Sequence, residues 1–394
     1  MPSKSRGFST KAVHAGETRD PLTGSITTPI YQTSTFGFSS TEGLIDVINE
    51  KVEGYVYTRF GNPTTRVVEK KVTELECAED GAAFSSGMEA VATTVITLVS
   101  SGSHIISIRD VYGGTFSLLS DVLPKFGVEV SMVEATDFDG MESAVKENTR
   151  IIYVESPTNP TLKIVDLSKV AKLSLEKGTK LIVDNTFASP FNQKPLRLGA
   201  DVVIHSATKY LGGHNDVTAG IVVGQRDFIH SLKDMRKIFG GVLDPHAAWL
   251  LLRGLKTLGL RMEKHNLNGM KVARYLEEHP KVKRVHYPGL ANHPQHSIAR
   301  NQMKGFGGVV SFELKGNLKT AMKFVDSLKL SFLSPSLGGT ETLVTQPATS
   351  SHYYVPREER LKIGITDELI RLALGIEDPE DIIADLDQAF NQID

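Results

Sequence analysis

Short runs of β-branched and aliphatic residues alternate with helical patterns through the middle of the chain, and this alternation constrains the fold most. The runs occupy residues 104–108, 128–135, 150–156, 180–186, 200–206 and 219–224. Between two of them, residues 166–178 have the spacing of an amphipathic helix that ends at Gly178. Strands separated by helices form βαβ units, whose strands lie parallel in a sheet covered on both faces. The sequence therefore predicts an α/β fold with a mainly parallel sheet.

The pattern changes after about residue 245, where a second domain is expected. Residues 247–279 are strongly helical, and a strand at 307–314 and helices at 317–328 and 379–393 follow. A length of 394 residues fits two or three domains. The expected parts are an N-terminal segment of residues 1–60 with little periodicity, a large domain of residues 61–250 and a C-terminal domain of residues 251–394.

Composition excludes several classes of protein. Lys and Arg number 44 against 46 Asp and Glu, so the basic excess that a nucleic-acid-binding surface needs is absent. The longest apolar stretch, residues 90–99, is half of the roughly 20 residues that cross a bilayer, so no membrane partner is expected. The single cysteine, Cys77, excludes an intramolecular disulfide and suits a reducing compartment, which predicts a cytoplasmic protein. Cys77 is expected to be buried in a helix.

Lys209 is the first candidate for chemistry. It follows the strand pattern of residues 200–206 and opens a glycine-rich loop, in the stretch ADVVIHSATKYLGGHND. Open parallel sheets bind ligands beyond the carboxyl ends of their strands. A lysine there contacts a phosphate, forms a Schiff base or is an ordinary surface charge, and this segment alone leaves all three open. Motifs for dinucleotide, P-loop, zinc-protease and hydrolase sites are absent from the sequence.

Asp184 ends a second strand of the same predicted sheet. Alone, Asp184 is typical of a turn or helix cap. Together, an Asp and a Lys at strand ends of one sheet suit the cofactor pyridoxal phosphate (PLP). This cofactor needs an amine to hold its aldehyde, an anion beside its ring nitrogen and donors for its phosphate. Hydroxyls of Ser206 and Thr208 flank the lysine, and Tyr112 in DVYGGT follows another strand and can stack on a ring.

A loop at residues 85–87 is expected to open a helix at Met88, with Gly81 in a turn before it. Ser86, Gly87 and Met88 would then offer backbone N–H groups to a phosphate at the start of a helix.

Nine motifs in order resemble the Cys/Met-metabolism PLP-dependent enzymes, the family of cystathionine γ-lyase, cystathionine γ-synthase and methionine γ-lyase. They are PIYQTSTF, YTRFGNPT, FSSGMEA, DVYGGT, VESPTNPTL, VDNTFASP, HSATKYLGGH, SLGGTETL and LIRLALGIED. The resemblance runs from about Thr10 to the C-terminus. It implies PLP fold type I (aspartate aminotransferase-like), with a smaller C-terminal α+β domain, and a PLP-dependent carbon–sulfur lyase.

The resemblance also implies roles for individual residues. Lys209 would hold the cofactor and then move protons, Asp184 would pair with the ring nitrogen, and Tyr112 would stack on the ring and act near the leaving group. The other implied cofactor contacts are Ser86, Gly87, Met88, Ser206 and Thr208 at the phosphate and Asn159 at the ring hydroxyl. Arg371 would bind the substrate carboxylate, with Ser336 beside it. No metal is implied.

Tyr57 and Arg59 would reach the cofactor phosphate of a neighbouring subunit, and Tyr57 would also border the substrate. Residues 1–60 would therefore pack on a partner copy, and a homotetramer built from two dimers with shared active sites is expected. The small-molecule partner is an amino acid.

Two positions depart from the family patterns that set specificity. Methionine γ-lyases of this type usually have Cys where this chain has Gly114, and cystathionine enzymes usually have Glu where it has Pro335. The leading hypothesis is a cystathionine γ-lyase that yields cysteine, 2-oxobutanoate and ammonia. Cystathionine γ-synthase and methionine γ-lyase are the alternatives, and another PLP reaction or a non-catalytic PLP-binding protein is the alternative of a different class.

Overall fold

The computed structural model describes residues 6–350, 353 and 357–393, and two sheets organise them. The first sheet has seven strands in the order β1-β7-β6-β5-β4-β2-β3. Its strands are β1 (Asp80–Phe84), β2 (His104–Ile108), β3 (Glu129–Val133), β4 (Thr149–Glu155), β5 (Lys180–Asp184), β6 (Val202–Ser206) and β7 (Gly220–Gly224). Strands β3, β2, β4, β5 and β6 pair in parallel, whereas β7 is antiparallel to both β6 and β1. The predicted α/β fold with a mainly parallel sheet is confirmed.

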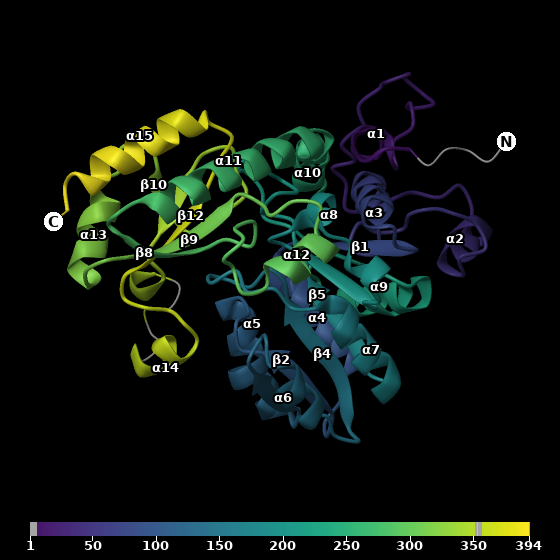
Figure 1. Cartoon of the computed structure of the whole chain (residues 1–394). Helices are drawn as coiled ribbons and strands as arrows, with labels where there is room; N and C mark the ends of the chain where they lie inside the picture. The colour runs from purple at the N-terminus through teal and green to yellow at the C-terminus, as the bar shows by residue number, and fades with distance from the viewer. Residues whose placement is uncertain (1–5, 351–352, 354–356, 394) are drawn as a thin grey trace.

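Helices cover both faces of this sheet (Figure 1). The helices around it are α3 (Pro63–Glu76), α4 (Gly87–Leu98), α5 (Gly113–Ser117), α6 (Phe138–Ser143), α7 (Leu167–Lys177), α8 (Ser189–Asn192), α9 (Arg226–Phe239) and α10 (Pro245–Lys256). Side chains of a strand point to alternate faces, so Ile204 and Val222 join a core with α4, α7 and α9, while Val203 and Val223 join one with α3 and α10. Because β5 and β6 are parallel and adjacent, their carboxyl ends lie at the same edge of the sheet.

The second sheet has five strands in the order β10-β11-β12-β9-β8. They are β8 (Val282–His286), β9 (Val309–Leu314), β10 (Phe332–Leu333), β11 (Leu343–Thr345) and β12 (Leu369–Ala373). Its accompanying helices are α11 (Leu258–Glu278), α12 (His296–Gln302), α13 (Leu318–Ser327), α14 (Arg357–Lys362) and α15 (Pro379–Phe390). Buried apolar residues of α11, α13 and α15 form a separate core with β8, β9 and β12. Strand β12 is internal, which buries Arg371 within the sheet.

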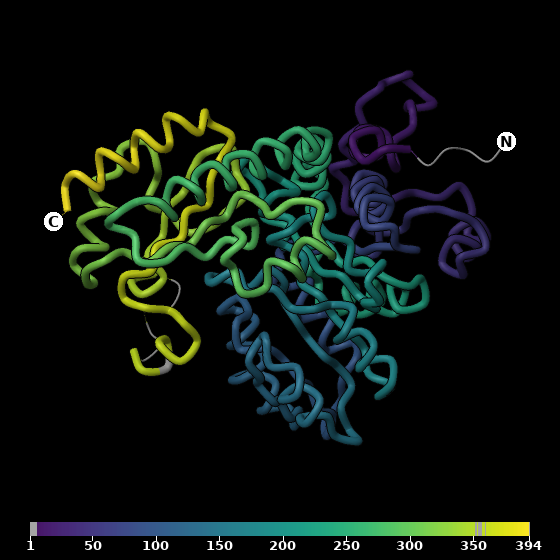
Figure 2. The backbone as a smooth tube through the Cα atoms, in the orientation of Figure 1, coloured from purple at the N-terminus to yellow at the C-terminus, as the bar shows by residue number. Residues whose placement is uncertain are grey.

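The N-terminal segment lies at the opposite end of the molecule from the C-terminus (Figure 2). Helix α1 (Phe8–His14) contacts α3, α10 and α11. Helix α2 (Thr41–Ile48) buries none of its residues, although Leu44, Ile45, Val47 and Ile48 are apolar. Leu22 and Ile26 near it in sequence are also exposed. This segment therefore presents apolar side chains that one chain leaves uncovered.

Four local predictions were wrong. Gly81 lies inside β1, where a Cβ would approach Thr73 Oγ1 to 2.8 Å, so close packing on α3 rather than a turn explains the glycine. The helical stretch 247–279 divides at Thr257 into α10 and α11. Helices α1 and α2, of seven and eight residues, lie in the segment where no regular structure was predicted. Cys77 is exposed and lies just after α3 as its C-terminal cap, in a left-handed conformation (φ 62°).

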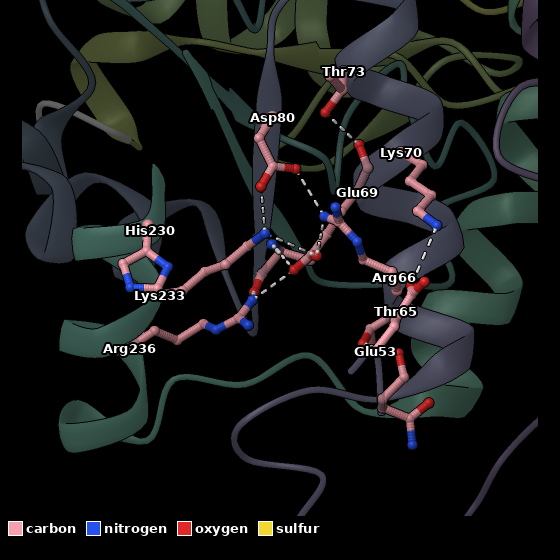
Figure 3. A network of polar contacts seen from close by, with 12 residues as sticks. Glu53, Thr65, Arg66, Glu69, Lys70, Thr73, Asp80, His230, Lys233 and Arg236 are labelled. Carbon is pink, nitrogen blue, oxygen red and sulfur yellow. Dashed lines mark hydrogen bonds and ion pairs between the residues drawn. The ribbon is translucent and has the colours of Figure 1, made fainter. Parts of the chain in front are cut away.

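An ionic cluster joins α3, β1 and α9 at the edge of the first sheet formed by β1 (Figure 3). Glu69 accepts from Arg236 at 2.9 Å and lies 3.1 Å from Arg66 and 3.5 Å from Lys233. Asp80 pairs with Arg66 and Lys233, both at 2.8 Å. Burial favours the neutral acid, but the three cations outweigh it and lower the pKa of Glu69 to about 2.

Candidate active site

Lys209 lies three residues beyond β6 and is half-buried. Its Nζ donates a hydrogen bond to Ser336 Oγ at 2.7 Å. Burial, and then the charge of Arg371, lower the pKa of Lys209 to about 8. Near pH 8 a large fraction of the amine is therefore unprotonated, which is the form that attacks an aldehyde or accepts a proton.

Arg371 reaches the same place from β12 of the other sheet and is 7% exposed. Its Nη1 donates to Asn159 Oδ1 at 2.9 Å and its Nη2 donates to the Ser336 carbonyl at 2.8 Å. Its Nε is buried without a hydrogen-bond partner among the described residues. Ser336 thus contacts both Lys209 and Arg371. Its backbone is in the left-handed region, with φ at 99°. The guanidinium retains an unused donor beside the lysine.

Asp184 ends β5 as a buried carboxylate. Its Oδ1 accepts from the Thr186 backbone at 3.0 Å and from the Thr186 hydroxyl at 2.5 Å, and Tyr153 donates to Oδ2 at 3.5 Å. Burial raises the pKa of Asp184, although the hydrogen bonds from Thr186 oppose the increase. Within the part of the chain that the structure describes, no lysine or arginine forms an ion pair with it. A buried acid of this kind is stabilised by a cation placed against it.

Helix α4 starts beside the end of β6. A Cβ on Gly87 would lie 2.7 Å from Ser206 Cβ, so only glycine allows this close approach. Ser86 Oγ caps the helix by accepting from the Glu89 amide at 3.1 Å. The amides of Gly87 and Met88 remain as first-turn donors at the positive end of the helix dipole.

Thr208 has a structural partner of its own. Its Oγ1 accepts from the Ala219 amide at 3.0 Å and donates to the Ala219 carbonyl at 3.3 Å. The loop that carries Lys209 is thereby fixed to the start of β7. A phosphate role for Thr208 stays a prediction, and the hydroxyl would have to share or exchange its bond to Ala219.

Tyr112 lies next to the start of α5, and its side chain is 51% exposed. Its backbone amide donates to Glu155 Oε2 at 2.9 Å. Burial and the neighbouring charge of Asp184 raise the pKa of Glu155 well above its usual range. A Cβ on Gly114 would come within 2.8 Å of Tyr112 Cε1 and 2.9 Å of Met88 Sδ, so any side chain there would displace the tyrosine ring.

Within one chain, Tyr57 and Arg59 contact other residues than those around Lys209. Arg59 donates to the Lys237 carbonyl at 2.5 Å, at the end of α9, and its guanidinium lies 5.4 Å from the centroid of the exposed Tyr57 ring. Among the described residues, no hydrogen bond or ion pair joins either residue to Lys209 or Arg371. Their predicted contact with a neighbouring subunit stays a prediction.

The profile of a family described as "Cys/Met metabolism PLP-dependent enzyme" matches residues 9–391. The chain belongs to this family. L-methionine gamma-lyase from Fusobacterium nucleatum subsp. polymorphum is 47% identical over 398 residues, covering 100% of both chains. Cystathionine gamma-synthase 1, chloroplastic, from Arabidopsis thaliana is 47% identical, covering 97% of this chain and 68% of its own. The crystal structure of cystathionine gamma-lyase from Lactobacillus plantarum, complexed with L-serine, has a TM-score of 0.92 at 43% identity, covering 98% of this chain and 99% of that chain.

These similarities confirm the predicted family, fold type I, the cofactor and the general enzyme class, the PLP-dependent carbon–sulfur lyases. The site residues also fit PLP on chemical grounds. Asp184 is a buried carboxylate without a cationic partner in the described chain, and Gly87 allows the amide end of α4 to approach Ser206 closely. The described residues hold no group of three or more His, Cys, Asp or Glu side chains arranged for a metal ion. None of their helices is long and apolar enough to cross a membrane.

The sequence did not identify Tyr153 and Thr186 as partners of Asp184. Thr186 follows Asp184 by two residues, and an Asx-type hydrogen bond at that spacing could have indicated it. Tyr153 comes from β4, the strand next to β5, so only the sheet order places its hydroxyl near the carboxylate.

Proposed function

We propose that this protein catalyses γ-elimination on cystathionine, which takes up one water and releases cysteine, 2-oxobutanoate and ammonia. The observation that carries the proposal is the pair of cations on Ser336: an amine with a lowered pKa beside a buried guanidinium that keeps a free donor. Arg371 would bind the α-carboxylate, because a guanidinium matches a carboxylate with two parallel hydrogen bonds. This orients the α-carbon of an amino acid toward Lys209.

Lys209 and Tyr112 would then transfer protons. Bound PLP supplies an electron sink for the charge that develops when the substrate loses its α-proton. Lys209 in its unprotonated form would take that proton, and Asp184 would keep the cofactor ring electron-poor. Tyr112 would donate a proton to the departing sulfur, a step for which its exposed hydroxyl is accessible. Ser86, Gly87, Met88, Ser206 and Thr208 would hold the phosphate and Asn159 the ring hydroxyl.

The resemblance implies Cys at position 114 in methionine γ-lyases, so Gly114 supports cystathionine over methionine as the substrate in this proposal. Pro335 is exposed next to Ser336 and offers no carboxylate to the distal amino group of cystathionine. The resemblance implies Glu at this position for cystathionine γ-lyases and γ-synthases alike, so Pro335 does not separate the two activities. Cystathionine γ-synthase activity is the second candidate, supported by the relative from Arabidopsis thaliana.

A substrate panel tests the proposal. The holoenzyme is assayed with L-cystathionine, L-methionine, and O-acetyl- and O-succinyl-L-homoserine with and without L-cysteine. We expect the highest kcat/KM with cystathionine, with 2-oxobutanoate as the oxoacid. Pyruvate instead would indicate β-elimination, methanethiol from methionine would indicate a methionine lyase, and faster formation of cystathionine from an acylhomoserine would indicate the synthase.

Arg371→Lys should raise KM for the amino-acid substrate roughly 10- to 100-fold while cofactor content stays near normal. Lysine keeps the positive charge but loses the two-pronged hydrogen bond to a carboxylate. Steady-state kinetics and the PLP absorbance per subunit measure the two quantities. Loss of cofactor with an unchanged KM would contradict the carboxylate role.

We further propose a homotetramer of two dimers, in the cytoplasm, with residues 1–60 packed on the partner copy. The apolar side chains of α2 are not buried in one chain, and Ile48 at its end and Val52 after it are more than half exposed. Burying such a surface stabilises association by about 25 cal/mol per Å² of apolar area. Tyr57 and Arg59 lie on this segment, so they would complete the cofactor and substrate site of a neighbour.

Mixing two inactive variants tests the shared site. Tyr57→Phe/Arg59→Ala would weaken PLP retention, and Lys209→Ala would remove the attachment point. If the site is shared, a mixed dimer contains one intact site, so co-refolded or co-expressed variants should regain activity that neither has alone. Absence of recovery in mixed oligomers confirmed by mass spectrometry would contradict a site shared between subunits.

A further inference from the structure

A cavity of about 310 Å³ lies between the two sheet-bearing parts of the chain. Its walls come from the loop after β4, from β8 and β9, from the segment before α12 and from the turn that leads to β12. None of the residues assigned to the PLP site lines it. The volume is at the lower end of the roughly 300–1,000 Å³ of small-molecule sites, so the cavity has room for a small ligand.

Two threonines that line the cavity have hydroxyls without a partner among the described residues. Thr161 is 3% exposed, and its Oγ1 is buried without a hydrogen bond in the part of the chain that the structure describes. Thr366 Oγ1 is also buried without a hydrogen bond to any described residue. An unpaired buried hydroxyl costs about 1–3 kcal/mol, so these two groups indicate a place for a hydrogen-bonding ligand.

One positively charged side chain at the cavity has no partner among the described residues. Glu313 is paired with His286 at 2.9 Å and with Lys283 at 3.2 Å. Arg284 lines the cavity with an exposed side chain, and its guanidinium forms no hydrogen bond or ion pair with any residue that the structure describes. The acid in the wall is therefore already paired, whereas the guanidinium is free to bind a ligand.

Lys163 and His293 complete the polar wall. Lys163 pairs with Asp110 at 3.0 Å and also with Glu134, so its charge is used. His293 is buried, and its Nδ1 accepts from the Gln295 amide at 3.2 Å. Burial and then the nearby His286 lower the pKa of His293 to about 4, so the ring is neutral at pH 7. Of the lysine and arginine side chains that line the cavity, Arg284 is the one without a partner among the described residues.

We propose that this cavity binds a small oxyanion, a carboxylate or phosphate group held by Arg284 with hydrogen bonds from Thr161 and Thr366. A guanidinium and two hydroxyls supply the donors that such a group accepts. The site is separate from the substrate site, so its ligand would be an effector rather than a reactant.

The loop after β4 connects this cavity to Arg371. Thr158 and Lys163 close a turn through a backbone hydrogen bond of 3.0 Å, and Lys163 N also donates to Thr158 Oγ1 at 3.1 Å. Thr161 and Asn159 lie in this turn, and Asn159 accepts from Arg371. A ligand on Thr161 would restrain the turn and with it the Asn159–Arg371 contact. This step rests on the proposed carboxylate role of Arg371, and it predicts a changed KM.

Isothermal titration calorimetry of the holoenzyme tests binding, with inorganic phosphate and succinate as separate probes. We expect at least one probe to bind, and Arg284→Gln to weaken it about tenfold or more. Thr161→Val should weaken binding severalfold without lowering Tm, because it removes a hydroxyl that lacks a partner. Arg274→Gln, an exposed arginine of α11 outside the cavity, is the matched control and should bind normally.

Binding of succinate alone would identify a carboxylate site, and binding of phosphate alone a phosphate site. Failure of both probes to bind, or equal binding to Arg284→Gln, would overturn the proposal. The bound probe should also change KM in the wild type but not in Arg284→Gln. An unchanged KM would overturn the coupling to Arg371. Calorimetry needs no turnover, so its result is independent of whether the proposed reaction is correct.

Discussion

Lys209→Ala should lower kcat by about 10³-fold or more, because one change removes both the attachment point of the cofactor and the base for the α-proton. The side chain is only half-buried and bonds to Ser336 alone among the described residues, so its loss should leave the fold intact. Steady-state assays and the near-ultraviolet absorbance of bound PLP measure the change. Borohydride reduction of the wild type followed by peptide mass spectrometry should place the label on Lys209.

Lys172→Ala provides the control for this substitution. Lys172 lies on α7, its side chain is 78% exposed, and it should tolerate replacement with full activity. Label on another lysine, or full turnover by Lys209→Ala, would contradict the proposed mechanism. Full turnover would also reopen the hypothesis that PLP binding in this chain is non-catalytic.

Glu69→Ala should destabilise the protein by about 3–5 kcal/mol, the usual cost of breaking a buried ion pair. Glu69 is 3% exposed and holds Arg236, itself buried, while its Oε1 also accepts from the Ala83 amide at 3.1 Å. Removing the carboxylate leaves these donors and the charge of Lys233 uncompensated between α3, β1 and α9 (Figure 3). Urea unfolding of the holoprotein, followed by circular dichroism, gives the change in unfolding midpoint.

Glu74→Ala on the same helix is the matched control. Glu74 pairs with Lys11 at 2.7 Å but is 52% exposed, and such surface pairs contribute about 1 kcal/mol or less. Equal destabilisation by the two substitutions would mean that helix propensity, and not the buried cluster, determines the loss.

The same carboxylate makes the fold sensitive to acid. Its pKa is lowered from 4.5 in the unfolded chain to about 2 in the folded protein. The stabilisation is therefore complete above pH 4.5 and disappears as the pH falls through 2, a loss of about 3 kcal/mol. Glu69→Gln should remove this part of the acid dependence, which a pH series of unfolding midpoints would measure.

The sequence alone predicted the parts of the fold that depend on local patterns. Strands β2, β4, β5 and β6 are largely buried runs rich in apolar residues, and β3 alternates apolar and polar residues. Helix α7 begins after Asp166, which caps it, and ends at Gly178 in a left-handed turn. It missed β1, β8 and β12, which are as long as β2, β5 and β6, because small residues in β1 and charged residues in β8 and β12 interrupt the apolar pattern.

The candidate site divides in the same way. The sequence identified Lys209, Asp184 and Arg371 by residue type, by their place after apolar runs and by resemblance to a family. It could not bring Ser336, 127 residues after Lys209, into hydrogen-bond contact, nor join Arg371 to Asn159 across 212 residues. Those contacts depend on how the two sheets pack against each other. Local patterns determined which residues could carry the chemistry. The burial and the nearby charge that lower the pKa of Lys209 exist only in the tertiary structure, as does the cavity that Arg284 lines.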